Sequence, residues 1–99
     1  MPGVQTIAEI KDKLTPVFDL YGVQCATLFG SIAKGTAVEN SDLDLMVDSG
    51  LKGLRFVGLM EAVRNAVLLP IDLLDISHIE KGSRIDREIQ ETGVVIYEK

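Results

Sequence analysis

The sequence has one cysteine, no tryptophan and no apolar run approaching the roughly 20 residues that a membrane-spanning helix needs. Because Cys25 stands alone, an intramolecular disulfide and a zinc site built from several cysteines are both excluded. The first residues also lack the basic start and apolar centre of a secretory signal. These absences predict a cytoplasmic protein that is not attached to a membrane.

Basic residues are scarce as well. Ten Lys and Arg stand against 15 Asp and Glu, which gives a formal net charge of −5 and a pI of about 4.7. Non-specific nucleic-acid binding depends on clustered Lys and Arg, and here they are scattered, so we expect no direct nucleic-acid binding. An acidic chain is better suited to metal ions or to a basic protein surface.

The 99 residues, 46% hydrophobic and 25% charged, are those of one globular domain. A domain of this size has a thin core, which a second copy or a different partner could stabilise. Homo-oligomers and hetero-oligomers are therefore both compatible with the sequence.

Helical and strand patterns alternate along the chain. Thr6 and Glu9 have the spacing of a capping box, and Pro16 could kink the helix that follows. We expect helices at 6–21, after a turn within 30–35, at 54–69 and at 81–91; strands at 23–29, 43–47, 71–76 and 94–97; and a polar loop at 36–41. The long helix at 54–69 allows a crossover, so strands 43–47 and 71–76 should be parallel. The result is an α/β (α+β) fold, with a mixed sheet of three to four strands flanked by helices.

Carboxylates occupy regular places in two of these strands. Side chains alternate along a strand, so Asp42 and Asp44 share one face, and Asp72 reaches the same edge from the next strand. Neighbouring carboxylates repel each other, and a cation would compensate; their oxygens suit Mg²⁺ or Mn²⁺. Three such carboxylates are enough for a two-metal site.

A phosphate site is expected beside them. Gly30 ends a strand and allows backbone N–H groups to approach a phosphate, while Ser31 opens a short helix. For these residues to lie beside Asp42, strands 23–29 and 43–47 should be antiparallel.

Together these residues resemble the signature of the DNA polymerase beta-type nucleotidyltransferase superfamily. The pattern is Gly30-Ser31, ten residues, and then Asp42-Leu43-Asp44, with Asp72 as the third aspartate. The resemblance is to the minimal nucleotidyltransferases and covers nearly all of residues 1–99, including the Gly-Val-Val-Ile-Tyr segment at 93–97.

The resemblance implies an antitoxin paired with a HEPN-domain toxin that acts on RNA. It implies transfer of AMP from ATP to a tyrosine hydroxyl of that toxin. Catalysis and the binding of two Mg²⁺ or Mn²⁺ ions would fall to Asp42, Asp44 and Asp72, and nucleotide binding to Gly30, Ser31 and Lys34. Many relatives carry arginines in the turn that here reads Ile-Ala-Lys at 32–34, so Lys34 would meet phosphate as a point charge. Two alternatives stay open: an inactive antitoxin that only covers its partner, and a nucleotidyltransferase acting on small molecules.

Other polar residues have simpler interpretations. Asp48 and Asp75 look like surface charges at strand ends, and His78 like a structural histidine. Cys25 is expected to be buried, and Met46 to pack beneath a helix.

Overall fold

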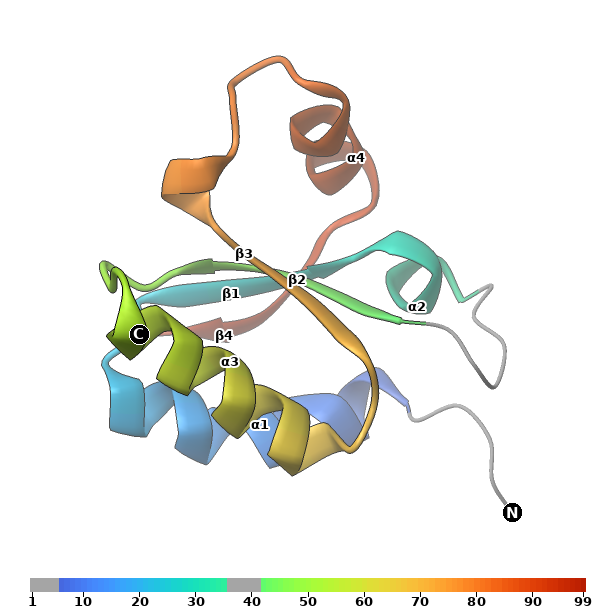
Figure 1. The fold of residues 1–99 in the computed structure, drawn as a ribbon. Helices are drawn as coiled ribbons and strands as arrows, with labels where there is room; N and C mark the ends of the chain where they lie inside the picture. Colours follow the sequence, from blue (N-terminus) through green and yellow to red (C-terminus); the bar gives the residue numbers. More distant parts are fainter. Residues whose placement is uncertain (1–5, 36–41) are drawn as a thin grey trace.

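The computed structural model describes residues 6–35 and 42–99, which form a four-stranded sheet with helices on both faces (Figure 1). The polar loop expected at 36–41 lies outside the described residues. The elements in chain order are α1 (Ile7–Tyr21), β1 (Cys25–Phe29), α2 (Gly30–Lys34), β2 (Leu43–Asp48), α3 (Leu54–Val67), β3 (Ile71–Asp75), the 3₁₀-helix η1 (Ile76–His78), α4 (Arg84–Thr92) and β4 (Val94–Glu98).

The sheet is mixed, as predicted, with strand order β3-β2-β1-β4. β1 runs antiparallel to both β2 and β4, whereas β2 and β3 are parallel and are joined through α3. Both strand directions inferred from the sequence are therefore confirmed.

Side-chain caps mark where α1 and α4 begin. Thr6 and Glu9 form the predicted capping box: Thr6 Oγ1 accepts from the Glu9 amide at 3.1 Å, and the Thr6 amide donates to Glu9 Oε1 at 2.8 Å. Pro16 lies within α1 without ending it. The last helix begins at Arg84, three residues later than expected, because Ser83 Oγ accepts from the Asp86 amide and caps it there.

One layer of two helices covers a face of the sheet. In Figure 1, α1 and α3 lie below the strands, while η1 and α4 lie above them. The core between the sheet and the α1–α3 layer includes Ile10, Leu14 and Phe18 of α1, Leu59 and Val63 of α3, and Leu28, Leu43, Leu45 and Val47 of the strands. Since strand residues alternate between faces, burying Leu43 and Leu45 directs Asp44 to the opposite side, toward α4.

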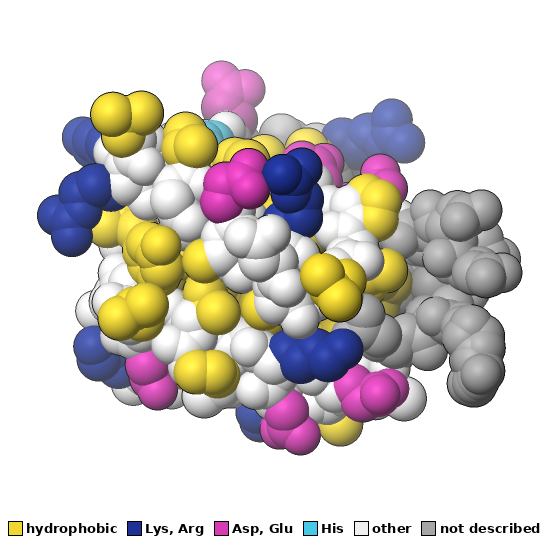
Figure 2. All heavy atoms as spheres, turned by 60° about the horizontal axis from the view of Figure 1, so that its bottom comes forward, with side chains coloured by type: hydrophobic (Ala, Val, Ile, Leu, Met, Phe, Trp, Pro, Cys, Tyr) yellow, Lys and Arg dark blue, Asp and Glu magenta, His cyan; other side chains and the backbone are white. Residues whose placement is uncertain are grey.

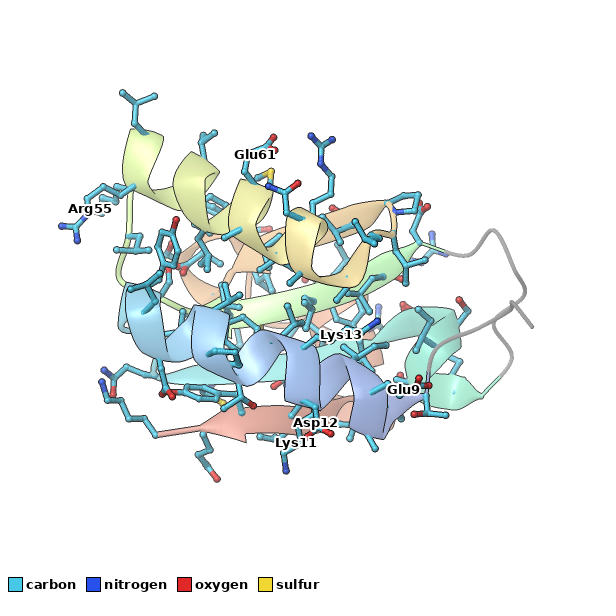
Figure 3. All side chains as sticks on the ribbon, turned by 90° about the horizontal axis from the view of Figure 1, so that it is seen from below. Glu9, Lys11, Asp12, Lys13, Arg55 and Glu61 are labelled. Atoms are coloured by element: carbon cyan, nitrogen blue, oxygen red, sulfur yellow. The ribbon has the colours of Figure 1, made fainter. Side chains whose placement is uncertain are left out.

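The outer surface of the α1–α3 layer is mixed in character. Figure 2 shows apolar side chains scattered among charged ones on this face, and Figure 3 labels charged residues of α1 and α3 that lie on it. Leu20, Leu54 and Leu68 are among the exposed apolar residues. No helix in the described ranges 6–35 and 42–99 has the length and apolar character to cross a membrane.

Asp75 corrects the sequence prediction of a surface charge. Its side chain is 3% exposed and accepts four hydrogen bonds, from the amide and hydroxyl of both Ser49 and Ser77. Burial alone would raise its pKa, but these four donors outweigh it and lower the pKa to about 2. Asp75 therefore ties the turn after β2 to η1, a role that depends on residues far apart in the sequence.

Of three further polar or sulfur-containing residues interpreted from the sequence, two agree with the structure and one differs. The structural role of His78 is confirmed: its Nδ1 accepts from the Asp75 amide at 3.3 Å, and its ring meets Phe56 edge to face at 5.4 Å. Asp48 is exposed, as predicted. Cys25 was expected to be buried but is half-buried, because it lies on the sheet face that α1 and α3 leave uncovered.

Candidate functional site

The sheet brings three predicted site residues to one end of neighbouring strands. In the parallel pair of β2 and β3, Asp44 is the register partner of Asp72. In the antiparallel pair of β1 and β2, Asp44 faces Phe29, so Gly30 follows directly beside it. Residues 30, 44 and 72 are thus assembled by backbone pairing, and Asp42 immediately precedes β2.

Gly30 and Asp44 are in unusually close contact. Gly30 has φ +78°, and a Cβ placed on it would lie 2.1 Å from Asp44 Oδ2 and 3.0 Å from Asp44 Cγ. Both the backbone conformation and the space exclude a side chain there. The requirement for glycine at the start of α2 therefore comes from the carboxylate on the next strand.

Asp44 lies in surroundings that disfavour its negative charge. Its pKa is raised to about 6, first by burial and then by the negative charges of Asp72, Asp42 and Glu88. Asp44 is half-buried, whereas Asp42 and Asp72 are exposed. Such a cluster of acids would gain stability from a bound cation.

An open cleft of about 540 Å³ lies in front of these carboxylates. The sheet supplies Phe29, Asp44 and Asp72, and α4 with its cap supplies the opposite wall through Ser83, Arg84, Ile85 and Glu88. Its volume falls within the ~300–1,000 Å³ typical of small-molecule sites.

The wall formed by α4 is the part of the site that sequence reasoning missed. Glu88 acts on Asp44 electrostatically and also pairs with Lys34, with 3.8 Å between Nζ and Oε2. Lys34, predicted to meet phosphate, thus contacts a carboxylate of α4 here. The sequence gives little indication that α4 takes part in the site, since a helix rich in Arg and Glu usually lies on the solvated surface.

The carboxylate oxygens of Asp42, Asp44 and Asp72 are of the ligand type that divalent cations such as Mg²⁺ prefer. As the side chains stand, no three Asp, Glu, His or Cys groups among the described residues converge closely enough to hold an ion. The backbone register nevertheless makes Asp44 and Asp72 direct neighbours on adjacent parallel strands.

A mixed sheet that sets a glycine turn against carboxylates of two neighbouring strands is compatible with metal-assisted phosphoryl or nucleotidyl transfer. The chain belongs to the polymerase beta nucleotidyltransferase family, whose model matches residues 12–99. Family membership implies a nucleotide substrate and divalent metal ions.

One curated relative shares a local segment. The chain is 43% identical over 44 residues to the Methanocaldococcus jannaschii protein named "Putative protein adenylyltransferase MJ0435". The match covers 44% of this chain and 47% of that protein, so the chain matches about half the length of the relative.

Solved structures share the fold over most of the chain. A chain from a toxin–antitoxin complex with AMP-PNP superposes with a TM-score of 0.76 at 22% identity, covering 90% of this chain and 73% of that one. A chain from the Shewanella oneidensis complex of a tri-AMPylated HEPN toxin with its MNT antitoxin gives a TM-score of 0.71 at 16% identity, covering 95% and 74%. At these identities the likeness establishes the common fold.

Proposed function

We propose that residues 1–99 form a single nucleotidyltransferase domain that moves AMP from ATP to a tyrosine hydroxyl of a HEPN-domain toxin, and so acts as an antitoxin. The observation that carries the proposal is the position of Asp44, which touches Gly30 and is in register with Asp72. That arrangement supports a site in which a glycine turn and two neighbouring carboxylates lie together at one strand end.

In this scheme Asp42, Asp44 and Asp72 hold two ions, Mg²⁺ or Mn²⁺. Bound there, the ions would neutralise phosphate charge and make an acceptor hydroxyl easier to deprotonate. The raised pKa of Asp44 supports this role, because burial and then the neighbouring negative charges disfavour its ionised form, and a bound cation would compensate for both.

The chain's other site residues position the reactants. The absence of a side chain at Gly30 lets the Asp44 carboxylate lie against the start of α2, and the backbone of Gly30 and the hydroxyl of Ser31 are the candidate contacts for the nucleotide's phosphates. Asp72, the more exposed member of the register pair, is the candidate base for the acceptor hydroxyl. In-line attack forms the bond from the acceptor oxygen to the α-phosphorus and breaks the bond to the leaving pyrophosphate.

A protein acceptor is supported by two features. The cleft opens to solvent on the α4 side of the sheet, and Asp72, one of its two lining aspartates, is exposed. Solved structures of the same fold include complexes with a HEPN toxin, one of them AMPylated. A cytoplasmic location belongs to the same proposal.

Intact-mass spectrometry tests the proposal. The chain is incubated with ATP, Mg²⁺ and a HEPN-domain partner encoded beside it, and each transfer should add about 329 Da to the partner, the mass of a phosphodiester-linked AMP. Asp44→Asn should still bind the partner but leave its mass unchanged, and Asp48→Asn, an exposed charge at the other end of β2, should transfer normally.

Growth protection separates the alternatives. If Asp44→Asn protects cells as well as the wild type and the partner's mass never changes, neutralisation by binding alone replaces the proposal. If AMP appears on a small molecule and never on the partner, a small-molecule nucleotidyltransferase replaces it.

A further inference from the structure

We propose that Arg84 and Arg87 of α4, together with Lys34 of α2, form a polyphosphate-binding subsite that takes the β- and γ-phosphates of a nucleoside triphosphate. The inference rests on the proposed function for the identity of the nucleotide. The binding of a polyphosphate by these three residues does not require that the chain transfers AMP.

The subsite is a recess of about 300 Å³ between α2 and α4, lined by Lys34, Arg84, Arg87, Glu88, Glu91 and Thr92. It adjoins the cleft in front of Asp44, since Arg84 and Glu88 line both. A phosphate chain whose α-phosphate lies near Gly30 and Asp44 can therefore extend past Arg84 into the recess.

The two arginines are available for a ligand. They lie three residues apart on α4, so their side chains project from the same side of the helix. Both are exposed, and no carboxylate in the described parts of the chain lies within ion-pair distance of either guanidinium. Guanidinium groups bind phosphate oxygens with two parallel hydrogen bonds, which favours an anionic ligand of this class.

The local charge balance differs from that of the chain. The chain carries −5 overall, yet this recess combines three cations with Glu88 and Glu91. Glu88 is already engaged with Lys34 at 3.8 Å, so its charge is partly compensated before any ligand arrives. A triphosphate tail would compete with Glu88 for Lys34 and add two arginine contacts in exchange.

The size of the recess is compatible with a short phosphate chain. About 300 Å³ is at the lower end of the range for small-molecule sites. Two phosphate groups attached to a nucleotide in the adjoining cleft match both its size and its position.

Calorimetric titration with inorganic tripolyphosphate, ATP and AMP tests the subsite. The variant is Arg84→Gln/Arg87→Gln, and the control is Arg55→Gln/Arg64→Gln, which removes two exposed charges from α3. The wild type should bind tripolyphosphate, and the α4 variant should weaken tripolyphosphate and ATP binding by about tenfold or more while changing AMP binding less than about twofold. The control should bind all three like the wild type, and because the four arginines are exposed, both variants should keep the wild-type melting temperature.

Three results would overturn the subsite: no binding of tripolyphosphate by the wild type, equal weakening of ATP and AMP in the α4 variant, or equal weakening in the control. Failure of the proposed function looks different. A wild type that binds tripolyphosphate through these arginines but never transfers AMP keeps the subsite and loses the enzyme. Transfer of AMP by the wild type, with tripolyphosphate binding unchanged in the α4 variant, keeps the enzyme and loses the subsite.

Discussion

The Asp44 carboxylate lies against the Cα of Gly30, so that a Cβ at residue 30 would stand 2.1 Å from Asp44 Oδ2. The contact joins the first residue of α2, directly after β1, to the second residue of β2. The carboxylate therefore occupies the space that a side chain at residue 30 would need.

Gly30→Ala is expected to abolish AMP transfer and to lower the melting temperature. The methyl group forces Asp44 to move, and the left-handed φ of +78° adds roughly 1–2 kcal/mol of backbone strain. Gly22→Ala is the matched control, because Gly22 has a similar φ of +71° with nothing within 4 Å of its added Cβ. Thermal melts and mass-based transfer assays compare the two, and equal loss of transfer in both would refute the role of the Asp44 contact.

Asp44→Asn should raise the melting temperature of the metal-free protein at neutral pH. The pKa of Asp44 is raised to about 6 by burial and neighbouring acids, so folding costs free energy once the pH exceeds its ordinary value of 3.8, and the full cost applies above 6. After allowance for solvent screening, the gain should be on the order of 1 kcal/mol, or about 4–8 °C. The gain should shrink below pH 4, and a constant difference across pH would contradict the electrostatic origin.

The same variant should lose the stabilisation that ligands provide. Mg²⁺ or Mn²⁺ with millimolar ATP should raise the wild-type melting temperature, because a ligand that binds the folded state alone stabilises it by mass action. Asp44→Asn and Asp42→Asn should each abolish that increment, while Asp48→Asn should retain it. A wild type whose melting temperature does not respond to metal and ATP would remove the basis for catalysis.

Asp75→Asn should destabilise the fold in a pH-dependent manner. Four hydrogen bonds hold the Asp75 pKa at about 2 against an ordinary 3.8, so its charged form stabilises the fold fully above about pH 4 and less as the pH falls through 2. The loss in Asp75→Asn should be about 2 kcal/mol or more at pH 7 and smaller at pH 2. Urea unfolding at several pH values measures it, and a loss that grows at acid pH would show that another group is responsible.

Ser31→Ala should reduce transfer less than loss of an aspartate does. A hydroxyl contributes one hydrogen bond, worth on the order of 1–2 kcal/mol, whereas Asp44→Asn should cost several kcal/mol in transition-state stabilisation. Rates of AMP transfer under limiting ATP give both values. A Ser31→Ala variant as slow as Asp44→Asn would point to a role for Ser31 beyond contact with phosphate.

The sequence was sufficient to predict most of the helices and strands, the antiparallel pairing of β1 with β2 and the parallel pairing of β2 with β3. Those features depend on local rules: a capping box at Thr6, alternation along strands, and a crossover helix long enough to make β2 and β3 parallel. The capping box and the strand alternation depend on residues close together in sequence, and the parallel pairing depends only on the length of the connection between the two strands.

Only the tertiary structure decided the surroundings of residues whose neighbours come from distant parts of the sequence. Asp75 has the sequence context of a surface charge, yet Ser49, 26 residues away, donates to it, and together with Ser77 satisfies its charge in the interior. Whether Arg84 and Glu88 face the cleft or open solvent depends on how α4 lies across the sheet, and no periodicity within α4 encodes that placement. The free energy of burying and pairing polar groups is set by what surrounds them in space, and for these residues the surroundings come from other elements of the fold.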